Sequence, residues 1–277
     1  MPVIAMTQEM GSLAKEVALR VAQDANLAVM RHEVLENIAG KMHVPSSLIS
    51  RLREGKAGLV ERLTTDRERV AVYTAEEVFA LADKGNVVLR GWGATCLLRP
   101  VPHVVTVRIT RPMRKRVAWL MNELGTDDPS FAEAEIRRSD NAHAARIHAQ
   151  FGVTWGDPLL YDVVLNTDRM SVESAAAQIL QLAQRPEYQE TEASRAMLGD
   201  LALAAAVRAA LKDNLPTREV NIDIEPTGNA VVLRGIVIDE QERQETARVA
   251  AGVPGVAKVD NQLQVMAITR RFTYSKT

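Results

Sequence analysis

Apolar and polar positions in the first two thirds of the chain alternate between the compact runs of buried strands and the wider spacing of amphipathic helices. Compact apolar runs, bounded by Gly, Pro or polar residues, predict strands at 3–6, 27–30, 87–90, 103–109 and 161–166. Helical patterns predict helices at 12–26, 33–42, 46–53, 74–84, 112–124 and 171–183, and the long polar stretch 129–150 is also interpreted as helical. Because strands that alternate with helices favour parallel crossovers, we expect an α/β fold with a parallel sheet and helices on both faces.

Local signals place several helix boundaries. Thr74 and Glu77 have the spacing of a capping box, which predicts a helix start at Thr74. Gly85, followed by Asn, predicts the end of that helix. We expect Pro112 to open a further helix and Ser171 to cap another.

A change in composition separates this region from the rest of the chain. The stretch 184–195 is polar, contains Pro186 and has no apolar period, which predicts a linker over 185–195. It would join a first domain, 1–184, to a second, 196–268. The order expected in the second domain indicates a small α+β fold, with helix 196–213, strands 218–225 and 229–237, helix 240–251 and strand 255–268. We expect residues 269–277 to form a basic tail.

Composition narrows the classes of function. A formal net charge of −1 and an aromatic content of 4% disfavour a nucleic-acid partner. Cys96 is the only cysteine, so the chain forms no internal disulfide and no thiolate metal cluster, and we interpret Cys96 as a small buried apolar residue. We recognise no signal peptide and no apolar run long enough to span a membrane, and we expect a bacterial-type cytoplasmic location.

The second domain resembles a BON domain. The matching stretches are "VVLRGIV" and "ERQETARVAAGVPGVAKVDNQL", where Gly235, Gly255, Val256, Val259 and Asn261 follow the family order and spacing. Ala230 departs from the pattern, because Gly is common before the first strand. We assign Gly235 and Gly255 to structural roles at a strand end and a turn, and Asn261 marks the family pattern at the start of the last strand. The resemblance implies binding rather than chemistry, and we favour a protein partner or self-association over phospholipid.

The first domain resembles the cytidylate kinase-like family of P-loop nucleotide kinases. The resemblance is carried by "VIAMTQEMGSLAKEVA", "NVVLRGWGATCLL", "HVVTVRITRPMRKRV", "DNAHAAR" and "FGVTWGDPLLYDVVLNTDRMSVE", of which the last is the most specific. It implies a P-loop kinase fold, a nucleotide ligand, and ATP with Mg²⁺ as the cofactors of an active enzyme.

Three stretches depart from the family pattern. Where the family has Gly-Ser-Gly-Gly and a basic residue, this chain has Gly11-Ser12-Leu13-Ala14-Lys15, and Glu16 replaces the usual magnesium-binding Ser or Thr. The family's Gly-Arg-Gly-Ala appears as Gly91-Trp92-Gly93-Ala94, and its Asp-x-x-Arg as Asp140-x-x-His143. Trp92 would either stack on a base or pack in the core. Arg116 keeps a family position, in a basic cluster that is either solvated surface or a nucleotide or lipid patch.

By this resemblance, the candidate nucleotide- or phosphate-binding residues are Gly11, Ser12, Lys15, Gly91, Trp92, Gly93, Arg116, His143 and Arg146. We assign no catalytic residue and no metal ligand. Three hypotheses follow: a nucleotide- or anion-binding pseudokinase with a regulatory or sensing role, an active CMP-type kinase, or an interaction protein without a nucleotide. Because phosphoryl transfer needs a close amide cradle and compensating cations, the losses favour the first.

Overall fold

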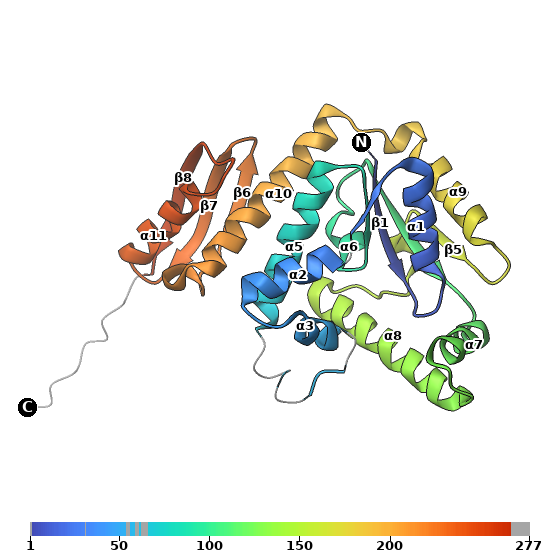
Figure 1. The fold of residues 1–277 in the computed structure, drawn as a ribbon. Coiled ribbons are helices and arrows are strands. Elements are labelled where there is room, and N and C mark those ends of the chain that lie inside the picture. Colours follow the sequence, from blue (N-terminus) through green and yellow to red (C-terminus); the bar gives the residue numbers. More distant parts are fainter. Residues whose placement is uncertain (1, 31, 54–55, 59–60, 62–65, 267–277) are drawn as a thin grey trace, which may run out of the picture. The chain divides into compact units, whose positions relative to one another are not determined.

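The computed structural model describes residues 2–30, 32–53, 56–58, 61 and 66–266. The chain divides into two compact units, Met1–Leu198 and Gly199–Thr277 (Figure 1). The basic tail expected over 269–277 lies outside the described residues. Within the described part of the chain, no helix combines the length and the apolarity needed to cross a bilayer.

The first unit is built on a five-stranded parallel sheet, as the sequence predicts. Its strands are β1 (Val3–Gln8), β2 (Ala28–Met30), β3 (Val87–Arg90), β4 (Val104–Thr110) and β5 (Val163–Asn166), in the spatial order β2-β3-β1-β4-β5. Every neighbouring pair is parallel, so the carboxyl ends of all five strands lie at one edge. β1 lies between β3 and β4, where connections leave in opposite directions, and such a crevice is a usual ligand site in α/β sheets.

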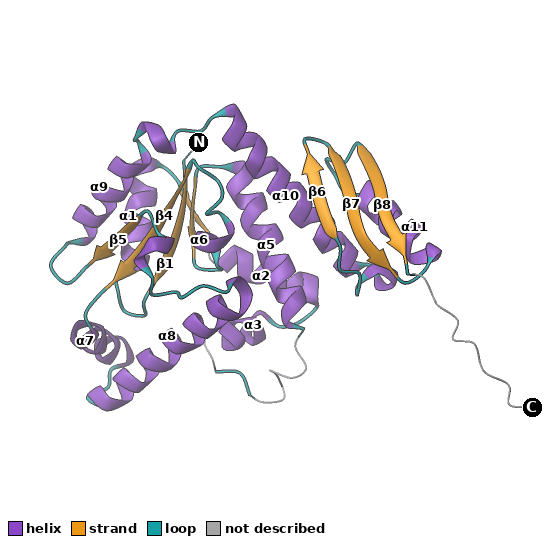
Figure 2. Cartoon of the chain, turned by 180° about the vertical axis from the view of Figure 1, so that it is seen from behind, coloured by secondary structure: helices purple, strands orange, loops and turns teal. Residues whose placement is uncertain are grey.

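Helices cover both faces of this sheet, as Figures 1 and 2 show. They are α1 (Ala14–Ala25), α2 (His32–Met42), α3 (Ser46–Arg53), α5 (Arg67–Lys84), α6 (Ala94–Leu97), α7 (Met113–Leu124), α8 (Pro129–Phe151) and α9 (Val172–Ala183). Two short 3-10 turns, η1 (Pro158–Leu160) and η2 (Pro186–Tyr188), follow α8 and α9, and α10 (Glu192–Asp213) comes next.

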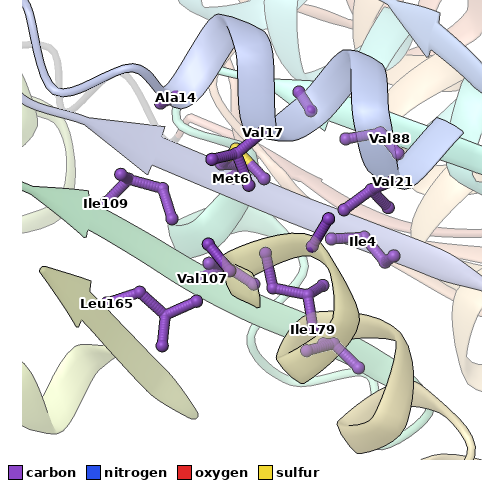
Figure 3. Packing of buried hydrophobic residues seen from close by; sticks show 14 of the residues in the cluster. Ile4, Met6, Ala14, Val17, Val21, Val88, Val107, Ile109, Leu165 and Ile179 are labelled. Atoms are coloured by element: carbon purple, nitrogen blue, oxygen red, sulfur yellow. The ribbon is translucent and has the colours of Figure 1, made fainter. Parts of the chain in front are cut away.

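One face of the sheet makes a core with α1 and α9 (Figure 3). Ile4 and Met6 alternate with Val3 and Ala5 along β1, so the two longer side chains point to the same face. They pack with Val17 from α1 among fully buried neighbours. Burial of each such side chain contributes roughly 1.5–3 kcal/mol, and this packing fixes the start of α1 against the end of β1.

The predicted start of α5 at Thr74 is wrong. The helix begins at Arg67, and the side chain of Asp66 caps it by accepting a hydrogen bond from the amide of Arg69. Thr74 lies inside the helix, where its hydroxyl donates to the carbonyl of Val70 at 2.6 Å. A Thr hydroxyl can bond backward within a helix, so the capping-box spacing alone did not locate the first turn.

The segment expected as a linker is partly helical. α10 begins at Glu192, because Thr191 and Ser194 cap its first turn by exchanging amide-to-hydroxyl hydrogen bonds of 3.0 and 3.1 Å. The Ser194 hydroxyl also lies 2.7 Å from Nδ1 of His103, and both side chains are buried. Residues 192–195 are therefore an anchored helical turn of the first unit and not an extended connection.

The second unit has the predicted α+β order. η3 (Leu215–Thr217) follows α10, and β6 (Asp223–Thr227), β7 (Ala230–Val237), α11 (Glu240–Ala251) and β8 (Lys258–Val265) complete it. The sheet order is β6-β7-β8, with β6 antiparallel and β8 parallel to β7. The first strand begins at Asp223, five residues later than the 218 expected. Asp239 caps α11, since its side chain accepts a hydrogen bond from the Glu242 amide at 2.8 Å.

Close packing surrounds the glycine and asparagine positions of this unit. Gly235 has a φ of 143°, and a Cβ there would stand 2.9 Å from the Ile222 side chain. Gly255 has a φ of 95°, which favours glycine. The amide nitrogen of the Asn261 side chain donates to the carbonyl of Arg243 at 3.2 Å, which ties β8 to α11.

Candidate anion-binding site

The loop between β1 and α1 is closely packed. Gly11 has a φ of 78°, and a Cβ at this position would meet the ring of Trp119 at 2.9 Å and the backbone of Arg116 at 3.3 Å, both from α7. Leu13, the N-cap of α1, has a left-handed φ of 62° and gives no side-chain cap. A left-handed conformation costs a non-glycine residue roughly 1–2 kcal/mol, so Leu13 carries strain at a place where glycine would fit freely.

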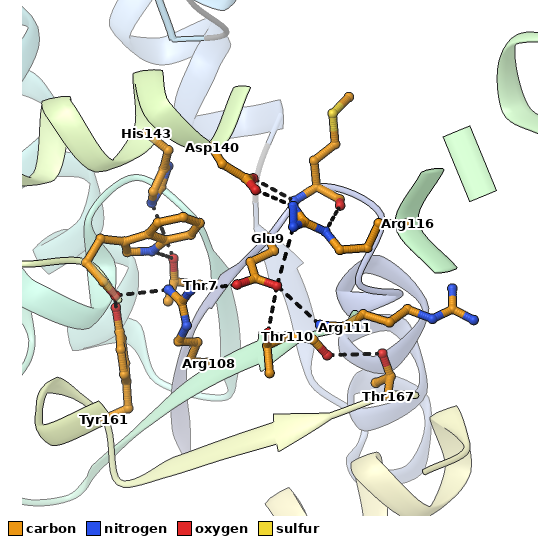
Figure 4. Close-up of polar contacts among 12 residues, drawn as sticks. Thr7, Glu9, Arg108, Thr110, Arg111, Arg116, Asp140, His143, Tyr161 and Thr167 are labelled. Carbon is orange, nitrogen blue, oxygen red and sulfur yellow. Dashed lines mark hydrogen bonds and ion pairs between the residues drawn. The ribbon is translucent and has the colours of Figure 1, made fainter. Parts of the chain in front are cut away.

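Glu9 is the centre of the polar contacts around this loop (Figure 4). Its carboxylate accepts hydrogen bonds from Arg108 Nη2 at 2.9 Å, from the Thr110 hydroxyl at 2.6 Å and from the Arg111 amide at 3.2 Å. Nη1 of Arg116 lies 3.7 Å from the same carboxylate. Three elements, β1, β4 and α7, are joined through this one side chain.

Arg116 is buried, with 4% of its surface exposed, and it contacts both the loop and α8. Its Nε donates to the carbonyl of Met10 at 2.8 Å, and its Nη2 pairs with Asp140 Oδ2 from α8. The other carboxylate oxygen of Asp140 accepts from the Met10 amide at 3.2 Å, and burial raises the pKa of Asp140. The solvated-surface interpretation is therefore wrong for Arg116, whereas Arg114 in the same cluster is exposed.

Trp155 connects β1 with β4 in the same region. Its indole nitrogen donates to the Thr7 hydroxyl at 3.0 Å, and the guanidinium of Arg108 lies 4.1 Å from the ring centroid. The backbone carbonyl of Trp155 accepts from Arg108 Nη1 at 2.9 Å and from the Tyr161 hydroxyl at 2.7 Å. Burial raises the pKa of Tyr161, so the phenol remains a donor at neutral pH.

His143 and Arg146 lie next to this cluster, on α8. Nη2 of Arg146 is 3.0 Å from Nδ1 of His143, while Nε2 of His143 is 3.4 Å from the Thr7 hydroxyl. Because a guanidinium only donates, Nδ1 of His143 accepts in this arrangement, which belongs to the neutral imidazole. Burial lowers the pKa of Arg146 to about 10, so the guanidinium is still charged at pH 7.

A cavity of about 480 Å³ opens between the ends of β1 and β3 and helix α8. Four of the predicted site residues line it, namely Gly91, Trp92, His143 and Arg146. The other five, Gly11, Ser12, Lys15, Gly93 and Arg116, lie outside its lining. Gly93 packs against the ring of Phe151, and a Cβ at position 93 would lie only 2.9 Å from that ring. Trp92 is 6% exposed, so most of its ring is packed in the protein.

The lining of the cavity is strongly basic. Lys56, Arg90, Arg138 and Arg146 contribute cations, and Asp140 is the one carboxylate among the described residues that line it. Sequence reasoning missed Lys56, Arg90 and Arg138, together with Glu9 and Arg108 in the adjoining network. Arg90 and Arg108 did carry a signal, because an arginine at a buried position of an apolar strand, 6% exposed in both cases, requires a partner or a ligand.

The loop retains some features of an anion site. The first-turn amides of α1 have no side-chain cap, and the Ser12 hydroxyl is buried with no hydrogen-bond partner among the residues that the structure describes. Lys15 is exposed on the first turn, where it could reach an anion. The amides of Met10 and Ser12, however, already donate to Asp140 and to the Glu9 carbonyl.

These residues fit the triphosphate of ATP poorly. Two loop amides are engaged, Leu13 and Ala14 replace small flexible residues, and the carboxylates of Glu9 and Asp140 lie beside the loop. Glu16 stands in place of the magnesium-binding hydroxyl, and in the described ranges no group of three or more His, Cys, Asp or Glu side chains is placed to hold a metal ion.

Comparison with known families agrees with this architecture. The model of the cytidylate kinase-like family matches residues 3–169, and the model of the BON domain matches residues 199–267. The chain therefore belongs to the cytidylate kinase-like family, and its second unit carries a BON domain. Both resemblances inferred from the sequence are confirmed. Among curated proteins, none matches the chain significantly.

One solved structure supports the fold, and two others are similar at a lower level. A crystal structure of an uncharacterized protein from Eubacterium ventriosum covers 67% of this chain and 100% of its own, with 18% identity and a TM-score of 0.53. Shikimate kinase from Bacteroides thetaiotaomicron has 17% identity, covers 66% of this chain and 99% of its own, and has a TM-score of 0.41. A gluconokinase from Sinorhizobium meliloti has 15% identity, covers 66% and 94%, and has a TM-score of 0.43. The similarity to the Eubacterium ventriosum structure extends to the fold alone.

Proposed function

We propose that this protein is a degenerate cytidylate kinase-like protein that binds a nucleotide or a related anion and transfers phosphoryl groups weakly or not at all. In this proposal the BON domain mediates contacts with a protein partner or a second copy, and ligand binding has a regulatory or sensing role. The observation that carries the proposal is the basic cavity beside a loop whose donors and cations are bound to the protein's own carboxylates.

We expect phosphoryl transfer to be poor because the arginines beside the loop are bound to groups of the protein itself. Phosphoryl transfer is catalysed mainly by positioning and by cations and amides directed at the transferring group. Arg116, the basic family position, is bound to Asp140 and the Met10 carbonyl, and Arg108 is bound to Glu9 and the Trp155 carbonyl. Each missing contact of this kind costs on the order of 2–4 kcal/mol in the transition state, so several together leave little rate.

Protein contact through the BON domain is favoured by its exposed surface. Ile236 and Ile238 at the end of β7 are each 63% exposed, and Met266, beyond the end of β8, is 54% exposed. On the open face of the sheet, Arg234 is paired with Glu225 at 2.5 Å. The other exposed charges of the described strands on this face are Lys258, Asp223 and Asp260, so within the described residues cations are not in excess for anionic lipid headgroups. An apolar patch without a basic field fits a protein surface better than a phospholipid.

Two measurements test the proposal. Thermal unfolding with ATP or CMP, each with and without Mg²⁺, should show stabilisation by at least one anion, since a ligand of the folded state raises the melting temperature. A coupled assay of ADP release with ATP and CMP should show no rate above the enzyme-free control. Robust turnover would establish the active-kinase alternative. If no anion stabilises the protein, the remaining hypothesis is an interaction protein that binds no nucleotide.

A further inference from the structure

We infer that the Leu13 side chain prevents the loop between β1 and α1 from binding the triphosphate of a nucleotide. The rest of the loop keeps the backbone of a phosphate-binding loop. This inference rests on the proposed function and assigns the weakness of the loop to one residue. It concerns binding alone, because the arginines that transfer would require are bound to Glu9 and Asp140.

Contacts from other elements hold the backbone of the loop in place. The Ser12 carbonyl accepts a hydrogen bond of 2.8 Å from the hydroxyl of Thr167, which follows β5. Arg116 from α7 donates to the Met10 carbonyl, and Asp140 from α8 accepts from the Met10 amide. Because these partners all lie outside the loop, its shape is held without the two glycines of the family pattern.

Leu13 and Ala14 occupy the positions of those two glycines, but only Leu13 is unfavourable there. Ala14 is 3% exposed, begins α1 and packs in the core between this helix and the sheet (Figure 3). Leu13 is half-buried, has a left-handed φ of 62° and is not part of that core. A left-handed φ favours glycine, and leucine is among the poorest residues at an N-cap. Of the two replacements, Leu13 is therefore the one that the surrounding structure does not accommodate.

Leu13 stands beside the groups that an anion would use. It is the N-cap of α1, and no side chain caps the first-turn amides of that helix. The hydroxyl of Ser12, which is 1% exposed, has no hydrogen-bond partner among the described residues, and Lys15 is exposed on the first turn. Helix-terminal amides and a cation attract phosphate oxygens. An apolar side chain at the N-cap offers these oxygens no polar contact and crowds their approach to the amides.

Isothermal titration of the full chain with inorganic triphosphate tests the inference, because this probe carries the anion without a base or a sugar. The wild-type protein should bind the probe weakly, and Leu13→Gly should bind it about tenfold more tightly or better. Leu13→Asn is the matched control. Asparagine tolerates a left-handed φ but is close to leucine in size, so this variant relieves the backbone and should gain no affinity.

Two variants in the Leu13→Gly background locate the bound probe. Lys15→Gln should remove the gain in affinity, whereas Arg146→Gln should leave it, because Arg146 lines the cavity and Lys15 does not. Ligand-free melting curves compare the folding of all variants.

Three results would overturn the inference while the proposed function for the wild-type chain stands. The first is that Leu13→Gly gains no affinity, or that Leu13→Asn gains as much. The second is a gain that survives Lys15→Gln and is lost with Arg146→Gln, which would place the probe in the cavity. The third is turnover of ATP and CMP by Leu13→Gly, since the inference restricts the effect of Leu13 to binding. Turnover by the wild-type chain would instead refute the proposed function.

Discussion

The Glu9 carboxylate accepts a hydrogen bond of 2.9 Å from Arg108, and the exposed fractions of the two side chains are only 17% and 8%. Their positions in the chain are 99 residues apart, and the contact joins the end of β1 to β4. Each charge of a buried ion pair is stabilised by the other, so removal of one charge leaves its partner desolvated and unpaired. The pair therefore ties the geometry of the loop to the stability of the first unit.

Glu9→Gln should destabilise the protein by about 3–5 kcal/mol, because Arg108 would lose its buried counter-ion. Urea denaturation followed by circular dichroism measures this loss. Glu133→Gln is the control, since Glu133 forms an exposed ion pair with Arg137 that is worth about 0.5 kcal/mol or less. Equal effects of the two substitutions would contradict a structural role for the Glu9 pair.

Gly11→Ala should cost about 2–4 kcal/mol, from the left-handed φ and from the contact of the new Cβ with Trp119. Gly152 provides a control with a φ of 69° and open space around its Cβ position, so Gly152→Ala should cost only about 1–2 kcal/mol. A double-mutant cycle with Trp119→Leu, measured by urea denaturation, should recover part of the Gly11→Ala loss. Strict additivity in that cycle would show that the two residues do not crowd each other.

The stability of the protein should fall below about pH 6.5 in part through His103. Burial lowers the pKa of His103 from its ordinary value of 6.5, so the unfolded chain binds the proton more tightly than the folded chain. The contribution of neutral His103 to the free energy of unfolding is complete above pH 6.5, and it is lost as the pH falls toward the lowered pKa. His103→Asn should flatten the dependence of the unfolding free energy on pH between 7.5 and 5, and a profile as steep as that of the wild type would exclude His103 as a source.

Ile236→Asp should weaken self-association, because Ile236 is exposed in the apolar patch at the end of β7. Analytical ultracentrifugation over a concentration series measures the effect, which we expect to be at least tenfold in the dissociation constant. Leu215→Asp is the control, since Leu215 is 76% exposed on η3 and does not belong to the sheet. In parallel, pelleting with anionic vesicles should recover little of the wild-type chain. Strong recovery would instead identify a lipid surface as the partner.

The order of strands and helices could be predicted from the sequence because it depends on local periodicity. Val87 to Arg90 is a buried strand between a Gly85 helix end and the Gly91 turn, and all of these signals are adjacent in the chain. The start of α5 was misplaced because two sites competed for it, and Asp66 caps the helix, whereas Thr74 bonds inside it. The helical start of α10 within the expected linker was missed for a related reason, because Ser194 is anchored by His103, which is distant in sequence.

The candidate site was only half predictable. Motif positions located Gly91, Trp92, His143 and Arg146, which line the cavity. The roles of Glu9 and Arg116 could not be inferred from the neighbouring sequence. Their charges are neutralised by partners on other elements, Arg108 on β4 and Asp140 on α8. Pairing over such distances depends on the order of strands in the sheet, which a single sequence does not specify.

All three tryptophans of the chain belong to the surroundings of the candidate site. Trp92 lines the cavity, Trp155 is hydrogen-bonded to Thr7, and Trp119 packs beside Gly11. Intrinsic emission excited at the indole band therefore comes from this neighbourhood alone, while the BON domain, which has no tryptophan, is silent. Titrations can be followed without an added dye, and the unfolding of the two halves of the molecule can be told apart by comparing fluorescence with far-ultraviolet ellipticity.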